Sequence, residues 1–410
     1  MDVVSRVYAA LFAVLLLTSC GQKRTAATIV PQASNQCKPT AIEGQYIVEW
    51  LDGRITVERA KDREDFLENF VTPKLDLIKR AELDQIVRLK SQPVQASETI
   101  PPNWGQEVVG AQAAWDRNIR GTNVVVAVID SGIDSTHPQL RNQLAINPNE
   151  SANGVDDDKN GYIDDIAGWD FATPDGNGTP NPTDQNGHGT HISGVIAADP
   201  MAGTVQGIAP QAKILPLQFM DASGAGTISR AIQAIEYAAQ RGAKVINASW
   251  GTVGCNQSLE TVIKKLSTQN ILFVTASGND YSDLTYNPSY PAAFPGIGQI
   301  VVGALTYNGF RADFSNYGPL VDLVAPGSPI YSTVPASRHA SGYAFMSGTS
   351  MAAPFVSGAA ALLWSYQPTA SVERVREAIL GSVLVKDHLN VATRGQLDIA
   401  AALQKFDNPE

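Results

Sequence analysis

Residues Val124-Val125-Val126-Ala127-Val128-Ile129-Asp130 form an unbroken apolar, mostly β-branched run that ends in a carboxylate. A run without polar alternation is typical of a strand buried on both faces of a parallel sheet. Outward from it, helical and strand patterns follow one another: helix 188–198, strand 213–220, helix 227–241, strand 244–249, helix 256–268, strand 271–276 and strand 300–305. This series predicts an α/β fold with a mainly parallel sheet covered by helices, and a ligand crevice at the carboxyl ends of its strands.

Length and charge narrow the functional class. The chain has 410 residues, enough for two or three domains, and hydrophobic residues make up 44% of it, as in a soluble globular protein. Its net charge of −10 argues against a nucleic-acid binder, which needs a basic face. We therefore expect no nucleic-acid partner.

The N-terminus has the layout of a secretory signal peptide. Val7–Leu17 is an apolar run too short to span a bilayer, lies behind Arg6, and ends in Leu17-Thr18-Ser19-Cys20. The last four residues resemble the bacterial lipobox, in which cleavage precedes a cysteine that carries lipid. The resemblance implies a signal peptide over 1–19, lipidation of Cys20, export from a bacterial cell and a membrane anchor in the cell envelope. An incidental cysteine after an ordinary signal peptide is the alternative.

Composition then divides the chain into further parts. Residues after Cys20 are rich in Thr, Ala, Gln and Pro, as in a mobile tether, and a highly charged stretch follows. That stretch holds a predicted strand at 46–51 and an amphipathic helix at 60–70, while 75–89 fits either structure. Three prolines after Ser91 indicate a linker. We predict a tether at 20–42, a small α+β domain at 43–92, a linker with the processing site at 93–102 and a main domain at 103–405.

Four polar residues fall at element ends in the main domain. Asp130 ends the first buried strand, His188 opens a helix, and Asn279 follows the strand at 271–276. Ser350 lies in Phe345-Met346-Ser347-Gly348-Thr349-Ser350-Met351-Ala352-Ala353-Pro354, where a loop of small residues meets a helix that reaches about Tyr366. Singly, each is a turn or cap residue. Together they predict an acid, an imidazole, an amide and a hydroxyl at one rim of the sheet.

The order of these residues points to a family. An α/β-hydrolase runs serine, acid, histidine, whereas this chain runs Asp130, His188, Ser350. The four motifs resemble those of the subtilisin-like serine peptidases (subtilases), over residues 104–403. The resemblance implies a subtilisin-like three-layer fold and peptide-bond hydrolysis through an acyl-enzyme, with no cofactor required. It implies Ser350 as nucleophile, His188 as general base and acid, Asp130 as its orienting carboxylate, and Asn279 with the Ser350 N–H as oxyanion donors.

The same resemblance implies where an extended substrate pairs. Ser223–Gly226 and Ser249–Gly251 resemble the two family segments that hydrogen-bond to a peptide backbone, and plain turns are the alternative. Ala276–Gly278 would wall the pocket for the residue before the cut, with Ser289 at its floor. Because no charge occurs at these matched positions, we expect a neutral or apolar side chain there. The expected substrate-binding residues are Gly224, Gly226, Ser249, Trp250, Gly251, Ala276 and Gly278.

An acidic loop at 153–165 begins like a calcium loop, with oxygen side chains at alternate positions. Its candidate ligands are Asp156, Asp158, Asn160 and Asp164. Similar inserts bind calcium in some subtilases, so structural calcium is one expectation and a solvated surface loop is the other. Gln139 stands where many relatives have an aspartate ligand of their tight calcium site, which argues against that second site here.

The charged unit at 43–92 resembles the subtilase propeptide, an intramolecular inhibitor and folding chaperone, and an unrelated spacer is the alternative. We therefore expect an exported zymogen that acts on peptide or protein substrates as a monomer. A lipid on Cys20 would anchor only the prosegment, so autocleavage would release the peptidase unless Cys37 and Cys255 form a disulfide. The functional alternative is a catalytically silent lipoprotein that binds peptides in the same cleft.

Overall fold

The computed structural model describes residues 24–29, 41–89, 92–93, 100–173, 175–294, 296 and 298–407. The chain divides into two compact units, a smaller one that includes Glu43–Leu83 and a larger one that runs from Asp84 onward. Cys20, Cys37 and most of the predicted tether and linker lie outside the described residues. Across the part of the chain that is described, no helix is long and apolar enough to cross a membrane.

The smaller unit contains three strands that form a sheet, together with a short helical stretch. Its sheet has the order β2-β1-β3, and β1 pairs with β2 antiparallel. Tyr46 and Phe66 are buried at its centre, with their rings stacked 3.7 Å apart. The ambiguous stretch at 75–89 is thus largely strand, and the predicted helix is displaced toward its C-terminal side. The elements are α2 (Ala26–Ile29), β1 (Ala41–Trp50), β2 (Ile55–Arg59), α3 (Arg63–Asp65), the helical turns Phe66–Val71 and Thr72–Lys74, and β3 (Ile78–Arg88).

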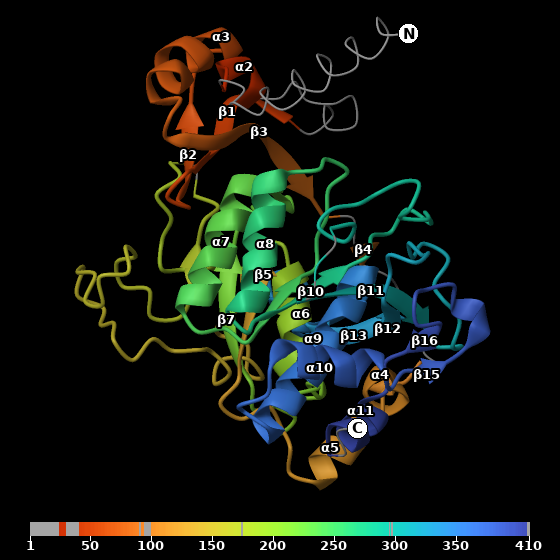
Figure 1. The fold of residues 1–410 in the computed structure, drawn as a ribbon. Helices are drawn as coiled ribbons and strands as arrows, with labels where there is room; N and C mark the ends of the chain where they lie inside the picture. Colours follow the sequence, from red (N-terminus) through yellow and green to blue (C-terminus); the bar gives the residue numbers. More distant parts are fainter. Residues whose placement is uncertain are drawn as a thin grey trace, which may run out of the picture. The chain divides into compact units, whose positions relative to one another are not determined.

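The larger unit is built on a nine-stranded sheet in the order β15-β16-β12-β11-β10-β9-β5-β7-β6, parallel except for the β15–β16 pair (Figure 1). The quoted apolar run forms β5, and Val126–Asp130 within it are all buried, as a central strand requires. The strands are β5 (Val125–Asp130), β6 (Trp169–Asp170), β7 (Lys213–Gln218), β9 (Val245–Ala248), β10 (Leu272–Ala276), β11 (Gln299–Thr306), β12 (Leu323–Ser328), β15 (Leu384–Val385) and β16 (Gly395–Gln396).

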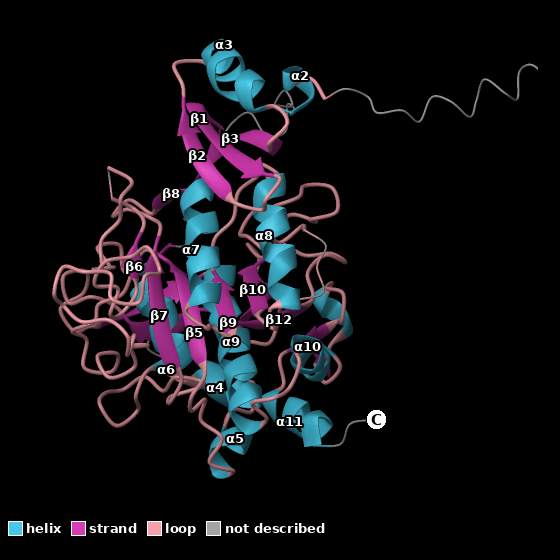
Figure 2. Ribbon diagram, turned by 60° about the vertical axis from the view of Figure 1, so that its left-hand side comes forward, coloured by secondary structure: helices cyan, strands magenta, loops and turns pink. Residues whose placement is uncertain are grey.

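Helices cover both faces of this sheet, which confirms the three-layer α/β fold (Figures 1 and 2). Helices α6 (His188–Ala197) and α9 (Thr349–Tyr366) pack against each other on one face, and α7 (Ile228–Gln240) and α8 (Gln257–Thr268) do so on the other. Thr227 and Asn256 cap α7 and α8 through their side-chain oxygens. The other helices described in the unit are α4 (Trp104–Val108), α5 (Gln112–Asp116), α10 (Val372–Leu380), the 3-10 helix Asp387–Leu389 and α11 (Ile399–Asp407).

The segment that follows Asp84 pairs with the edges of two short strands of the larger unit, β8 and β14. Strand β8 (Ala225–Thr227) pairs antiparallel with the end of β3, opposing Ile86–Arg88. A second sheet has the order β13-β14-β4, with β13 (Ile330–Thr333), β14 (Tyr343–Ser347) and β4 (Gln92–Pro93). The stretch before Ser350, predicted as a loop of small residues, is therefore largely strand β14. Both edges lie near the carboxyl ends of the central strands, where the site is built.

Candidate active site

Asp130 and His188 form a buried pair at the carboxyl end of β5. Asp130 Oδ1 and His188 Nδ1 are 2.8 Å apart, and the two side chains are 0% and 1% exposed. The Ser131 N–H donates to the same carboxylate oxygen at 2.8 Å. Because the carboxylate only accepts, the Nδ1 nitrogen carries the hydrogen, and Nε2 is the nitrogen able to accept a proton. The expected carboxylate–imidazole pair is therefore present.

A second carboxylate, Asp184, fixes the start of helix α6. Its Oδ1 accepts from Ser131 Oγ, Asn186 N and Gly187 N, and its Oδ2 accepts from Thr190 N and Oγ1, at 2.6–2.9 Å. Burial raises the pKa of Asp184, although these donors act in the opposite direction. Sequence reasoning missed this residue. Its position four residues before His188, next to the N-terminus of the helix, is the signal that could have found it.

Ser350 is the second residue of α9, and it does not cap that helix. Gly348 is the N-cap residue, and it makes no side-chain capping bond. The Ser350 hydroxyl instead donates to the Ser249 carbonyl at 3.0 Å, while Ser249 Oγ donates to the Ser350 carbonyl at 2.9 Å. The cap interpretation of this serine is thus excluded by geometry. Its hydroxyl lies beside the N-terminal backbone of a helix, where negative charge is stabilised.

Asn279 lies at the same helix start, held by Thr349. The amide oxygen Oδ1 accepts from both the Thr349 N–H and the Thr349 hydroxyl, each at 2.9 Å. Gly278 N in turn donates to Thr349 Oγ1 at 3.1 Å. These contacts assign the amide: its oxygen faces Thr349, so the Nδ2 group is the side able to donate elsewhere. Sequence reasoning did not identify Thr349 as a supporting residue.

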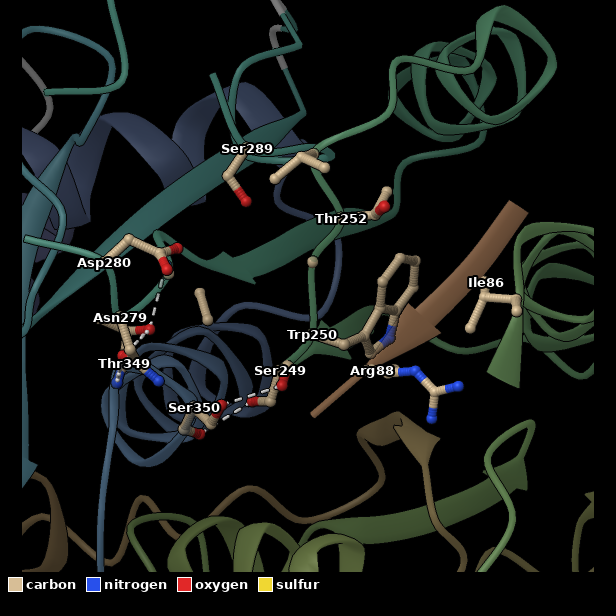
Figure 3. A pocket seen from close by; sticks show the side chains of 14 residues that line it. Ile86, Arg88, Ser249, Trp250, Thr252, Asn279, Asp280, Ser289, Thr349 and Ser350 are labelled. Atoms are coloured by element: carbon tan, nitrogen blue, oxygen red, sulfur yellow. Dashed lines mark hydrogen bonds between the residues drawn. The ribbon is translucent and has the colours of Figure 1, made fainter. Parts of the chain in front are cut away.

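A cavity of ≈ 350 Å³ opens beside Ser350 and Asn279 (Figure 3). Ser249, Trp250, Gly251, Ala276 and Gly278, all expected to bind substrate, line it, as does Ser289. Thr252, Val253, Asp280 and Thr349 also line it but were not anticipated, and Ile86 and Arg88 complete the lining. Asp280 thus adds a carboxylate to a lining whose matched positions carry no charge.

Gly224 and Gly226 lie outside that lining, on the segment of β8, and an extended part of this chain pairs with them. Val87 opposes Gly226, and the Leu89 N–H donates to the Gly224 carbonyl at 2.9 Å. A Cβ on Gly226 would lie 2.6 Å from the Phe219 carbonyl oxygen, so only glycine fits there. The segment can therefore pair with an extended polypeptide through its backbone, with little demand on side chains.

A buried Asp–His pair, a serine at a helix start and a positioned amide beside a peptide-sized cavity suit acyl transfer. The subtilase family matches residues 121–398. The chain belongs to the subtilase family. It is 34% identical over 302 residues to the major intracellular serine protease of Bacillus subtilis, across 73% of this chain and 84% of that protein. It is 35% identical over 306 residues to subtilisin Savinase of Lederbergia lenta, across 75% and 99%. This subtilase is a serine-type endopeptidase.

The acidic loop of this subtilase groups its carboxylates differently from the expected ligand set. Asp156 accepts from the backbone N–H groups of Asn160 and Gly161, and Asp164 accepts from those of Asn153 and Gly154. These bonds are those of turn-forming side chains. The carboxylates with oxygens within 4.8 Å of one another are Glu150, Asp158 and Asp165, so only Asp158 is common to both sets.

Asp165 is also engaged with groups from helix α7. It accepts from the Tyr237 hydroxyl and lies 3.1 Å from the Arg241 guanidinium, and Asn147 and Asn160 donate to it as well. An arginine beside a carboxylate competes with a cation for it. The loop is therefore held by its own hydrogen bonds and by Tyr237 and Arg241, and Asp165 is the member of the cluster that pairs with an arginine.

Gln139, the residue at which the sequence argued against a second calcium site, is buried and bonds to backbone groups. The buried amide nitrogen Nε2 donates to the carbonyls of Asp199 and Val205, each at 2.6 Å. Its Oε1 accepts from the Val205 N–H at 3.2 Å. The Asp199 and Val205 carbonyls are thus bonded to amide hydrogens of Gln139.

Proposed function

We propose that Asp130, His188 and Ser350 form the catalytic triad of this endopeptidase. The observation that carries the proposal is the 2.8 Å contact between Asp130 Oδ1 and His188 Nδ1, buried at the carboxyl end of β5. It holds the imidazole in the tautomer that can accept a proton at Nε2, and it stabilises the imidazolium formed in the reaction. Ser350 supplies the hydroxyl and the cavity beside it supplies the substrate site.

The reaction would follow the acyl-enzyme route. His188 Nε2 takes the Ser350 proton as the oxygen attacks the scissile carbonyl, then returns it to the leaving amine. Water enters and repeats the sequence on the acyl ester. The negative oxygen of each tetrahedral intermediate would accept from Asn279 Nδ2 and the Ser350 N–H, since Thr349 already occupies the amide oxygen of Asn279.

Hydrolysis of an unstructured protein such as casein tests the proposal against the silent-lipoprotein alternative. The purified wild type should release acid-soluble peptides, while the Ser350→Ala and His188→Ala variants should bind substrate but release none. A wild type without hydrolytic activity, or an active Ser350→Ala variant, would contradict the assigned roles. The peptide-binding alternative requires the first of these outcomes.

We also propose that the chain is made as a zymogen with residues 43–92 as its inhibitory propeptide. Asp84 supports this, because its buried carboxylate accepts from the N–H and hydroxyl of Ser229 in the first turn of α7. Ile86–Arg88 then occupy the edge of β8. An extended segment on the substrate-binding edge would exclude other peptides. Addition of an isolated 43–92 peptide to the mature enzyme should inhibit it, and no inhibition would reject the role.

We further propose that the chain is exported and carries lipid on Cys20, because its N-terminus resembles a lipoprotein signal peptide. Growth with an alkyne-tagged fatty acid should label the wild-type precursor and leave Cys20→Ser unlabelled. The Cys37–Cys255 disulfide would hold the matured peptidase to that anchor, and Cys255 is half-buried in the larger unit. Non-reducing gels after processing decide this, because a mature domain that migrates alone without reductant excludes the bond.

Structural calcium at the acidic loop is a further proposal, with Asp158 and the neighbouring Glu150 as the carboxylates best placed to bind it. The ion would stabilise the loop and take no part in the chemistry. Calorimetric titration of calcium into chelator-treated protein should show binding that Asp158→Asn and Glu150→Gln weaken. If titration of calcium into the wild type releases no more heat than dilution into buffer, the loop binds no calcium and is a solvated surface loop.

A further inference from the structure

A chain of buried hydrogen bonds joins the helix of Ser350 to the central sheet. Ser249 Oγ donates to the Ser350 carbonyl, and Asn247 Nδ2 donates to Ser249 Oγ, each at 2.9 Å. Ser357 Oγ, on the same helix as Ser350, donates to Asn247 Oδ1 at 2.8 Å. All of these residues are buried, and Asn247 is 0% exposed. The chain thus leaves α9 at Ser350, passes through Ser249 and Asn247, and returns to α9 at Ser357.

A proline inside α9 explains why the Ser350 carbonyl takes a partner from outside the helix. In an α-helix, the carbonyl of residue 350 accepts from the N–H of residue 354. That residue is Pro354, which has no N–H to donate. The Ser249 hydroxyl therefore fills the place that the helix leaves open at the turn that carries Ser350, and Figure 3 shows this bond beside the one from the Ser350 hydroxyl.

The direction of each bond follows from the groups that make it. A carbonyl only accepts, so the single hydrogen of the Ser249 hydroxyl is committed to Ser350. The Asn247 atom that faces Ser249 must then be the donor Nδ2, and Oδ1 is the atom that accepts from Ser357. Asn247 thus determines where the Ser249 hydroxyl points. A carboxylate at this position would only accept, and would draw the Ser249 hydrogen away from Ser350.

Asn247 is itself held in the middle of the sheet. It lies on β9, opposite Val128 of β5 on one side and Val274 of β10 on the other. Val128 comes two residues before Asp130 on the same strand. The Asn247 amide therefore ties the first turn of α9 to a strand that neighbours the strand of Asp130.

From these contacts we propose that Asn247 is a positioning residue of this subtilase. Through the Ser249 hydroxyl, it holds the first turn of α9 where the Ser350 oxygen and N–H meet the scissile carbonyl. A shift of that turn misaligns both the attacking oxygen and an oxyanion donor, so it raises the barrier of the chemical step. Substrate binding depends on β8 and on the cavity, whose lining does not include Asn247. The proposal rests on the proposed function of Ser350.

A double-mutant cycle on the mature enzyme tests the proposal, with active sites counted by a fluorophosphonate and kinetics measured on one peptide substrate. Asn247→Ala and Ser249→Ala should each lower kcat about tenfold, as for one lost hydrogen bond, and change KM less than about twofold. Because the two side chains act in series, the double variant should be no slower than Ser249→Ala alone. Asn247→Asp, which keeps the shape, should be as slow as Asn247→Ala. Gln396→Ala removes a buried amide near the edge of the same sheet and is the matched control, with kcat unchanged.

The outcomes separate this inference from the proposed function. An Asn247→Asp variant with the kcat of the wild type, or single losses that multiply in the double variant, overturns the inference alone. A change confined to KM, or an equal loss of kcat in Gln396→Ala, also overturns it, because the effect then belongs to substrate binding or to general destabilisation. If Asn247→Ala does not fold, the same cycle is measured with Asn247→Asp. A wild type that neither reacts with the fluorophosphonate nor hydrolyses the peptide overturns the proposed function and this inference together.

Discussion

At the scale of single residues, the site depends on side chains whose partners fix one orientation. Asp130 orients the imidazole of His188 through a hydrogen bond, and Thr349 orients the amide of Asn279. Asp184 bonds to the backbone at the start of the helix that carries His188. Preorganised donors of this kind stabilise developing charge more than mobile ones, because they need no rearrangement during the reaction. The contribution of each side chain to the rate can be measured by substituting that residue alone.

Asn279→Ala should lower kcat by about 10²–10³, the cost of losing one oxyanion donor in subtilisin, with a much smaller change in KM. The reason is that the amide would bond the oxyanion and not the ground-state carbonyl. Steady-state kinetics on one peptide substrate checks it, with the exposed Asn142→Ala as a control. A loss confined to KM would mean that Asn279 only binds substrate.

His191 makes stability depend on pH. Burial, and the nearby His188 to a smaller degree, lowers the pKa of His191 from 6.5 to about 3. Between these values the unfolded chain binds a proton that the folded chain does not, so stability should fall as pH falls, by up to about 1.4 kcal/mol per pH unit from this group.

Denaturant midpoints of the inactive Ser350→Ala chain, measured from pH 7 to pH 4, check this dependence. His191→Asn in that background should flatten the profile, while the exposed His388→Asn should leave it as steep as before. An unchanged slope in the His191 variant would assign the pH dependence to other groups.

The residues also show what a pattern can and cannot predict. Asp130, His188, Asn279 and Ser350 could be predicted as site residues because each ends or follows a strand or lies at a helix start, and such ends are expected to meet at one rim of a parallel sheet. Asp184 and Thr349 could not, because their roles come from a buried hydrogen bond with Ser131 and from hydrogen bonds to Asn279. Both properties depend on segments far apart in sequence.

At the scale of elements, the loop from Asp199 to Val205 is closed by one side chain. Gln139→Glu keeps the shape but points a carboxylate at two carbonyls, so each loses a donor at a cost of about 1–3 kcal/mol. We expect a lower thermal midpoint in chelator, partly restored by added calcium, and no calcium response of this loop in the wild type. Thermal unfolding with and without chelator measures it. Equal midpoints for both proteins in chelator would contradict the role of the Gln139 amide.

Element boundaries were predicted best where apolar patterns were long. The helix from the start of α9 to Tyr366 and the strands β5, β7 and β10 lie where the sequence placed them, within a few residues. Strand β14 was missed, because its residues are mostly half-buried, so no alternation of buried and exposed positions marks it, and its pairing with β13 and β4 is not visible in the sequence. The stretch at 75–89 fitted helix and strand equally by periodicity. Most of it forms strand β3, because it pairs with neighbouring strands of the sheet.

At the scale of the whole molecule, the larger unit combines a nine-stranded sheet with two short strand edges that pair with an extended chain. The same edges hold Ile86–Arg88 and Gln92–Pro93, so under the proposed function one arrangement would serve for inhibition and for substrate binding. Release of the prosegment after cutting is what would open the cavity. The proposed zymogen therefore requires Ser350 to act first on its own chain.

The full-length chain with Ser350→Ala should consequently stay at the precursor mass, while the wild type shortens during expression. Loss of the hydroxyl removes the nucleophile and leaves the fold, since Ser350 contributes no capping bond to α9. Intact-mass spectrometry follows both proteins. Processing of the Ser350→Ala chain by added wild-type enzyme would show that its cut site is accessible. Spontaneous shortening of the purified variant would assign the cut to another protease.

The most direct test of the account is the site of covalent modification by a fluorophosphonate. Peptide mapping by mass spectrometry after labelling of the mature wild type should place one adduct per chain on Ser350, and His188→Ala should reduce the labelling rate severely because the serine loses its base. An adduct on a different residue, or no adduct on an enzyme that still hydrolyses peptides, would contradict the central claim that Ser350 is the nucleophile.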